Sequence, residues 1–479
     1  MEKNRKILLV MPDERDVYKD ANVKVGAFHL PSLAFAILGA IAKQKNYDPT
    51  ILDLSVEDNP KEIFKKYLVD LNPEYVGVTC TSATYYQAIN IANWAKELSP
   101  GVKVLVGGTH VSSLVDEALE NKCFDYVFVG EADVSLGKFL EGIDPLQIEG
   151  LAFMRSDGQK HFLPNKTFLF DHILNNMPFP DYSLYDLSKY KISKLHSRNN
   201  PVVWLETSRG CPFNCGICNK IVHGQTFRAK SVDRVISEIK HLLGLGIKEF
   251  HIADDGFTSN LQRAEKICDR IIEEKLKFTW ACVNGIRVDR VTEPLLKKMK
   301  QAGCYRISFG IESGNQKVLD NLGKKITLDL VRSSVKMAKS VGLEVFGFFI
   351  FGFQDDTPET MMDTINFAKS LPLDLAKASI MIPFPGAPLY YRYKAMNLLF
   401  PPGNYKNFNA YISPRLVYRH PSLDWSVVEK YQEKFYRSFY FNPIYIIRRL
   451  FNAIKNGTIF SDVMAALQMK WYRKKYQEN

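Results

Sequence analysis

The chain has 479 residues, of which 46% are hydrophobic and 24% are charged, and its formal net charge is +11. This composition is ordinary for folded globular protein and excludes a disordered or collagen-like chain. No apolar run reaches the roughly 18 residues of a membrane-spanning helix, and the apolar run near the N-terminus is too short for a signal-peptide core. We therefore expect a cytoplasmic protein of about three domains.

The first part of the chain, residues 1–145, alternates apolar strand-like runs with segments of helical periodicity. This alternation predicts an α/β domain with a doubly wound, Rossmann-like parallel sheet that carries helices on both faces. Ligands of such sheets bind beyond the carboxyl ends of the strands. The predicted strands are Ile7–Met11, Thr50–Leu54, Tyr75–Thr79, Lys103–Gly107 and Asp125–Val129.

Three further regions follow. Residues 146–200 are rich in proline, polar and aromatic residues and are interpreted as an ordered connector. Residues 201–400 repeat the strand–helix alternation six times, which predicts a partial (βα)6 barrel. Residues 401–479 are expected to form a helical, basic and aromatic C-terminal region, since positions 443–479 carry seven basic and two acidic residues. The predicted barrel strands are Val202–Thr207, Glu249–Ala253, Thr279–Val283, Tyr305–Phe309, Glu344–Ile350 and Lys377–Ile382.

Three of the eight cysteines, Cys211, Cys215 and Cys218, form a C-x3-C-x2-C motif directly after the first predicted barrel strand. Structural zinc normally takes four protein ligands, whereas three thiolates on one loop can hold three irons of a 4Fe–4S cluster and leave the fourth iron open. Functional residues of such barrels lie where strands end and loops begin. The motif therefore predicts a metal site at the mouth of the barrel.

Three other interpretations of the motif remain open at this stage. Zinc could take a distant fourth ligand such as His223. An electron-transfer cluster could be completed by Cys268, Cys282 or Cys304, and the motif could also be purely structural. The matching non-enzymatic function is an iron–sulfur electron carrier or a scaffold.

The motif and the segments that follow it in order resemble the radical S-adenosylmethionine (SAM) superfamily, and in particular its branch with an N-terminal cobalamin-binding domain. The resemblance covers roughly residues 5–455, and the ordered set of motifs is far more specific than any one of them. The matching segments are His251–Thr258, Asn284–Asp289, Gly303–Gly314, Gly347–Gly352 and Pro383–Tyr390 in the barrel, and Gly107–His110 and Val129–Glu131 in the first domain.

The resemblance implies that Cys211, Cys215 and Cys218 ligate a 4Fe–4S cluster whose open iron binds SAM. It further implies that reductive cleavage of SAM yields a 5′-deoxyadenosyl radical, which abstracts hydrogen from an unactivated carbon. The implied SAM-binding residues are Asp254 or Asp255 for the amino group, Glu312 for a ribose hydroxyl, Arg287 or Ser313 for the carboxylate or ribose region, Ile217 for packing on adenine, and Gly310 within the fourth-strand motif.

The resemblance also implies cobalamin at the first sheet. The histidine motif D-x-H-x-x-G is absent, so His29 and His110 are weak candidates for a cobalt ligand, but members of this branch often bind cobalamin without one. Methylcobalamin would supply a methyl group, which makes a C-methyltransferase the leading interpretation; an oxidative cyclase or another carbon-centred rearrangement is the alternative. The implied cobalamin contacts are Pro12, Ser82, Gly107, Gly108, Thr109, Gly130 and Glu131.

The expected partners are a small-molecule or lipid-like substrate and an external electron donor of the flavodoxin or ferredoxin type. Nucleic acid is not expected, because RNA-binding signatures such as a GXXG loop do not occur. The basic C-terminal region is consistent with peripheral contact to an anionic membrane.

Overall fold

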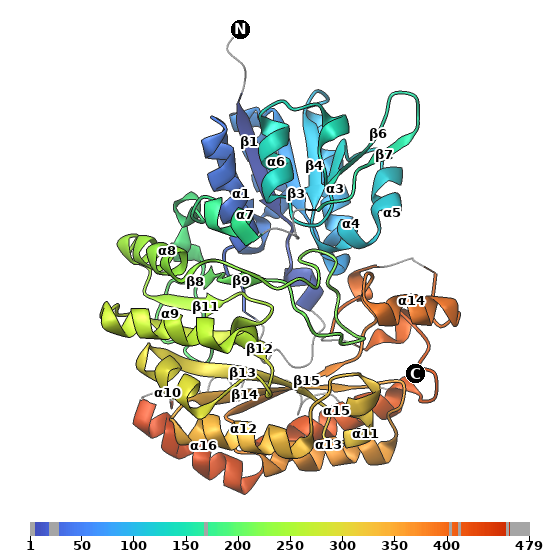
Figure 1. The fold of residues 1–479 in the computed structure, drawn as a ribbon. Coiled ribbons are helices and arrows are strands. Elements are labelled where there is room, and N and C mark those ends of the chain that lie inside the picture. The colour runs from blue at the N-terminus through green and yellow to red at the C-terminus, as the bar shows by residue number, and fades with distance from the viewer. Residues whose placement is uncertain are drawn as a thin grey trace.

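The computed structural model describes residues 5–18, 28–166, 171–401, 405–410, 413–456 and 459. Figure 1 shows two α/β units, with the first above the second in that view. Each unit is built around one sheet, and the strands of the two sheets follow the two alternating regions of the sequence. No helix among the described residues has the length and hydropathy needed to cross a membrane.

The first sheet has seven strands in the order β2-β1-β3-β4-β5-β6-β7. Strands β1 to β5 are parallel, whereas β6 and β7 form an antiparallel hairpin on the edge. The doubly wound sheet predicted from the sequence is thus confirmed, and the hairpin shows that the first part of the predicted connector continues this sheet. The strands are β1 (Lys6–Met11), β2 (Asp48–Asp53), β3 (Tyr75–Thr79), β4 (Lys103–Gly107), β5 (Tyr126–Phe128), β6 (Leu151–Met154) and β7 (Lys160–Phe162).

Helices flank both faces of the first sheet because each crossover between parallel strands passes over one face. Helix α1 begins after Ser32, whose hydroxyl accepts the Phe35 N–H. Its buried Phe35 belongs to the same core cluster as Ile7 and Leu9 of β1, whereas Ile37 and Ile41 pack with Leu174 and Met177. The helices are α1 (Leu33–Gln44), α2 (Pro60–Leu71), α3 (Tyr85–Leu98), α4 (Thr109–Ser113), α5 (Val115–Glu120), α6 (Asp133–Leu140) and, after the hairpin, α7 (Asp171–Asn176).

The second sheet has six parallel strands in the order β15-β14-β13-β12-β11-β8. Because sequential strands are neighbours and each is followed by a helix, the unit is the predicted partial barrel. A separate two-stranded ribbon, β9 (Ser208–Arg209) and β10 (Arg228–Ala229), closes the base of the loop that carries the cysteine motif. The barrel strands are β8 (Val202–Leu205), β11 (Glu249–Ile252), β12 (Thr279–Ile286), β13 (Cys304–Glu312), β14 (Glu344–Phe351) and β15 (Leu375–Ile380).

The helices of the barrel begin at side-chain caps and bury one apolar stripe. All six of them start after a Ser, Asn or Thr whose side-chain oxygen accepts a backbone N–H of the first turn, which satisfies a donor that the helix itself cannot. These caps are Ser231, Asn260, Thr292, Asn315, Thr327 and Thr357. The helices are α8 (Val232–Gly244), α9 (Leu261–Glu273), α10 (Glu293–Gln301), α11 (Gln316–Asn321), α12 (Leu328–Ser340) and α13 (Pro358–Ser370).

Helix α15 (Trp425–Tyr440) covers the open edge of the partial barrel. The Tyr436 hydroxyl accepts the N–H of Ala378 and donates to its carbonyl, both at 3.0 Å. The Tyr440 hydroxyl likewise accepts the N–H of Ala376 at 3.1 Å and donates to its carbonyl at 2.8 Å. Two tyrosines four residues apart on a helix therefore satisfy two alternate residues of the edge strand β15. The remaining helices are α14 (Pro388–Ala395) and α16 (Pro443–Asn456).

Candidate functional site

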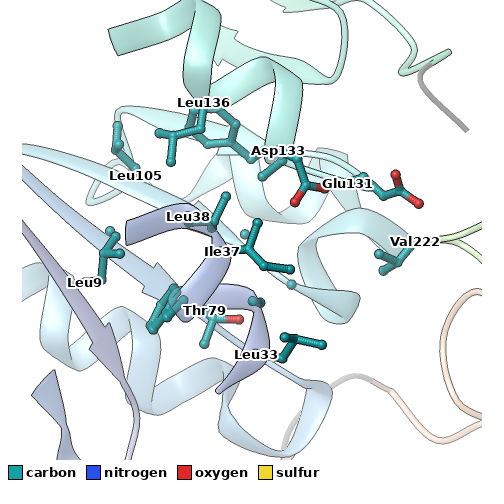
Figure 2. Close-up of a pocket in the computed structure, with 18 of the residues that line it drawn as sticks. Leu9, Leu33, Ile37, Leu38, Thr79, Leu105, Glu131, Asp133, Leu136 and Val222 are labelled. Carbon is teal, nitrogen blue, oxygen red and sulfur yellow. The ribbon is translucent and has the colours of Figure 1, made fainter. Parts of the chain in front are cut away.

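A cavity of about 320 Å³ lies between the two units, at the carboxyl ends of the first sheet's strands. It lies where the strand order reverses between β1 and β3, the position at which doubly wound sheets bind ligands. Its inner wall is apolar, and residues of the second unit, including Glu206, Arg209 and His223, complete it. Figure 2 shows the apolar wall formed by Leu9, Leu33, Ile37, Leu38, Leu105 and Leu136, with Glu131, Asp133 and Val222 along one side.

Four of the seven residues predicted to contact cobalamin line this cavity: Gly107, Gly108, Gly130 and Glu131. The other three do not line it. Thr109 begins helix α4, and the Pro12 carbonyl accepts the Ser55 hydroxyl at 3.2 Å. Ser82 is buried and hydrogen-bonded to His110 Nδ1 at 3.1 Å.

Neither candidate histidine is placed as a cobalt ligand. His110 is 1% exposed, lies against Ser82 and Tyr85, and is not part of the cavity wall. His29 Nε2 is 2.6 Å from a carboxylate oxygen of Asp53. The ring of His110 also lies 4.5 Å from that of Tyr405, and the ring of His29 stacks on Tyr190 at 5.7 Å.

Gly108 is required by the backbone rather than by a ligand. Its φ is +108°, and a Cβ at this position would lie 2.3 Å from the carbonyl oxygen of Cys80. A side chain would therefore meet main-chain atoms that cannot move aside. At Gly107 the nearest atoms would be 3.8 Å from a Cβ, so that glycine keeps space open in the cavity wall.

Glu131 is the centre of a buried cluster of charges that joins the two units. Its carboxylate accepts a hydrogen bond from Arg228 at 3.1 Å, lies 3.1 Å from Arg209, and is 2.9 Å from His223 Nδ1. Burial opposes ionisation of this carboxyl, yet the hydrogen bonds from His223 and Arg228 hold its pKa well below the usual range. Arg209 also pairs with Asp133 at 2.6 Å and Glu206 at 2.9 Å.

The cysteine motif lies on the loop between β9 and β10, at the carboxyl end of the first barrel strand, as predicted. Gly210, directly before the first cysteine, has a φ of +79°, and a Cβ there would lie 2.2 Å from the Thr226 carbonyl oxygen. This glycine therefore allows the two ends of the loop to meet. Gly130 lies close to the same loop, since its Cβ position is 3.7 Å from the Val222 carbonyl oxygen.

The alternatives that add a fourth protein ligand find no support. Cys268, Cys282 and Cys304 are at most 2% exposed and belong to the hydrophobic core of the barrel wall. Burial raises the pKa of Cys268 to about 12, as expected for a thiol that stays neutral. His223 faces Glu131 in the charge cluster.

The three cysteines suit a cluster with one open iron better than a metal ion that needs four protein ligands. The three motif thiols are free and partly or fully accessible on one short loop. Among the described side chains, no three His, Cys, Asp or Glu residues already stand in positions that would hold a metal ion. The chemistry of three thiolates without a fourth ligand fits a 4Fe–4S cluster that keeps one iron open.

The two neighbouring aspartates after β11 differ in their surroundings. Asp254 is 4% exposed, and its carboxylate accepts the N–H and hydroxyl of Thr207 and the hydroxyl of Ser208, each at 2.6 Å. Burial raises its pKa despite these bonds. Asp255 is exposed, and its carboxylate accepts the Gly210 N–H at 3.0 Å. Of the two, Asp255 is the one available to a ligand's ammonium group.

Glu312 has an unusual backbone conformation at the end of β13. Its φ is +68°, a region that residues other than glycine seldom adopt, and such strain tends to occur at functional positions. Its carboxylate binds Lys324 Nζ at 2.5 Å. A Cβ at Gly310 would lie 2.7 Å from Oε1 of Glu312, so that glycine makes room for the ion pair.

The remaining predicted SAM contacts have clear structural partners. Arg287 binds Asp289 at 2.8 Å, and its guanidinium lies 4.0 Å from the ring centroid of Phe213 in the cysteine loop. Ser313 is 1% exposed and lies 3.2 Å from the Thr364 hydroxyl, so its role in this structure is internal.

Comparison with known proteins agrees with this geometry. The sequence profile of the radical SAM superfamily matches residues 205–368, and that of the B12 binding domain matches residues 19–140. The uncharacterized methyltransferase PH0819 of Pyrococcus horikoshii is 33% identical over 480 residues, which cover 98% of this chain and 99% of the relative. The chain belongs to the radical SAM superfamily, in the branch with an N-terminal B12-binding domain.

Two further comparisons place this radical SAM protein among known relatives. The cytidylyl-2-hydroxyethylphosphonate methyltransferase of Streptomyces wedmorensis is 28% identical over 370 residues, covering 67% of this chain and 68% of the relative. The structure of the cobalamin-dependent SAM radical enzyme OxsB with aqua-cobalamin and SAM bound matches with a TM-score of 0.70 at 16% identity, over 96% of this chain and 72% of that chain. At that identity the match concerns the fold, and it confirms the predicted architecture.

A smaller pocket lies beside the cysteine loop. Ile217 packs against Val318, Phe353 and Met381 and lines a cavity of about 160 Å³ with Leu389. Asn321, Gln354, Asp355 and Arg392 add polar groups to its lining.

Several residues of this site were not singled out from the sequence. Lys324 pairs with Glu312, Phe213 stacks under Arg287, and Arg228 binds Glu131. Only Phe213 carried a local signal, since it lies within the motif. The other two pair with residues 12 and 97 positions away, and a single sequence does not reveal such pairing.

Proposed function

We propose that this enzyme is a cobalamin-dependent radical SAM methyltransferase that adds a methyl group to an unactivated carbon of a small molecule. When bound, the cluster supplies the electron that cleaves SAM, and methylcobalamin supplies the methyl group. The observation that carries the proposal is the position of the cysteine loop, which borders the interdomain cavity through Val222, His223 and Arg209 of the strand β9 that precedes the loop.

The chain's own residues would have distinct tasks in this reaction. Cys211, Cys215 and Cys218 would hold the cluster. The exposed Asp255 carboxylate would attract the ammonium group of SAM, and Glu312, held by Lys324, would accept a hydroxyl hydrogen bond.

The first unit and the charge cluster would serve the cobalamin side. The apolar wall of the 320 Å³ cavity would bury an uncharged part of the cofactor, and Gly107 would let it approach the backbone. The paired charges around Glu131 would keep the two units closed against water. Methyl transfer also fits the relative that acts on cytidylyl-2-hydroxyethylphosphonate, a small molecule. An external flavodoxin- or ferredoxin-type donor would supply electrons.

Anaerobic reconstitution with iron, sulfide and hydroxocobalamin tests the proposal. With SAM and a reductant, the wild-type protein should form 5′-deoxyadenosine, and hydroxocobalamin should remain bound through gel filtration. Cys215→Ala should abolish 5′-deoxyadenosine, whereas Cys268→Ala, which changes a buried thiol outside the loop, should not. An electron carrier would form none in any variant.

A second measurement separates methyl transfer from cyclisation. With SAM labelled on its methyl group and extracts of the host as a source of substrate, a methyltransferase gives a labelled product and S-adenosylhomocysteine. A cyclase gives a product that has lost hydrogen and carries no label.

A further inference from the structure

The last described helix, α16, exposes its apolar side chains. Ile444, Ile447, Phe451 and Ile454 are exposed by 72%, 58%, 70% and 59%. Their spacing of three or four residues places them on one face of the helix. Phe441, Ile446 and Leu450, each 47% exposed or more, extend this surface. A continuous apolar surface of this kind on a helix indicates an interaction site.

The opposite side of α16 is anchored to the barrel, so the orientation of the helix is fixed. The Tyr445 hydroxyl donates to the Asp374 carbonyl at 3.0 Å, and Arg448 donates to the Leu373 carbonyl. Tyr445 is 8% exposed and Ala453 is 3% exposed. A surface helix usually packs its apolar face against the protein core, but α16 packs the face with Tyr445 and Arg448 against the barrel and exposes its isoleucines.

The position of α16 separates this surface from the proposed active site. Leu373 and Asp374 precede β15, so α16 lies at the amino ends of the barrel strands, whereas the cysteine loop follows a carboxyl end. In Figure 1, α16 lies at the end of the molecule opposite the first unit. A partner at this surface would leave the mouth of the barrel open.

The charge of this region identifies the class of partner. Helix α16 contains no acidic residue, and positions 443–479 of the sequence carry seven basic and two acidic residues. Arg448 belongs to the anchored side of the helix, so the positive charge is a property of this region of the sequence as a whole. A second copy docked here by two-fold symmetry would bring these like charges together. An anionic lipid surface complements both the charge and the apolar face.

We propose that α16 docks this enzyme on anionic membranes, lying in the interface with Ile444, Ile447, Phe451 and Ile454 inserted among the lipids. The helix lies on the bilayer and does not span it, since 14 residues cover only about 21 Å. The contact concentrates the enzyme at the membrane and leaves its chemistry unchanged.

Flotation of the full-length protein with vesicles tests the proposal. The protein should float with phosphatidylcholine vesicles that contain phosphatidylglycerol and not with phosphatidylcholine alone, and added salt should weaken binding. The double variant Ile447→Glu/Phe451→Glu should bind at least about tenfold more weakly, because two apolar side chains lose their burial. Leu416→Glu, which changes a 68% exposed residue outside α16, should bind like the wild type.

Three results would overturn the proposal. The first is that the wild type does not float with anionic vesicles. The second is equal flotation of the α16 double variant. The third is a dimer in light scattering that the double variant dissociates while vesicles fail to bind, which would make a second copy the occupant. Circular dichroism of each variant establishes that the fold is intact.

Discussion

Replacing Glu131 by glutamine should weaken the junction between the two units. Glu131 is the carboxylate partner of Arg228, whose side chain is 1% exposed and whose Nε already lacks a hydrogen-bond partner among the described residues. Glutamine keeps the size of the side chain and removes its charge. Removing one member of a buried ion pair typically costs about 3 kcal/mol or more, because the other charge stays buried.

The loss should appear as a lower unfolding temperature, by roughly 5 °C or more for a unit of this kind. Circular dichroism or scanning calorimetry of Glu131→Gln measures it. Glu141→Gln is the matched control, since Glu141 pairs with Lys45 at an exposed position where an ion pair contributes at most about 1 kcal/mol. The reasoning would be refuted if the two variants unfolded at the same temperature.

Three other predictions concern the cysteine loop, the cavity and pH. Gly210→Ala should lower the iron and sulfide content after anaerobic reconstitution, while Gly216→Ala, whose Cβ would meet no atom within 4 Å, should retain both; equal contents would contradict the role given to Gly210. Ala34→Trp should fill the cavity mouth and reduce hydroxocobalamin retention on gel filtration by at least about tenfold, with SAM cleavage preserved; undiminished retention would place cobalamin elsewhere. Burial lowers the pKa of His223, but the contact with Glu131 outweighs this effect and raises the pKa above its usual value. Protonated His223 therefore stabilises the folded protein below about pH 6.5, and this stabilisation is lost as the pH rises through the pKa of the folded state. As the pH rises from about 6.5 through that pKa, the unfolding temperature of the wild type should fall more steeply than that of His223→Gln.

The fold could be predicted because its strands are continuous apolar runs. The predicted strand Lys103–Gly107 has the same bounds as β4, whose central valine and leucine residues are buried. Strand β7 was missed because it has three residues and is mostly exposed, so no hydrophobic pattern marks it. The boundaries drawn at residues 145, 200 and 400 remain predictions.

The site was predictable only where its signal is local. The spacing of Cys211, Cys215 and Cys218 identified the loop, and the structure places that loop at the barrel mouth. Glu131 was expected to contact cobalamin, yet its carboxylate is held by charged residues of the other unit. Asp254 and Asp255 looked equivalent, and only the hydrogen bonds from Thr207 and Ser208 distinguish them. Contacts between residues far apart in the sequence decide these roles, and the spacing of residues in a single sequence does not reveal such contacts.

The tyrosine hydroxyls that α15 presents to β15 have a practical consequence for shortening the protein. An uncovered parallel edge strand is a template on which another chain can add a strand. A fragment cut after β15 would lose both Tyr436 and Tyr440. The backbone N–H and carbonyl groups of Ala376 and Ala378 would then be free to bond to a neighbouring molecule. Such a fragment should form insoluble assemblies, so a minimal catalytic unit must extend through residue 440.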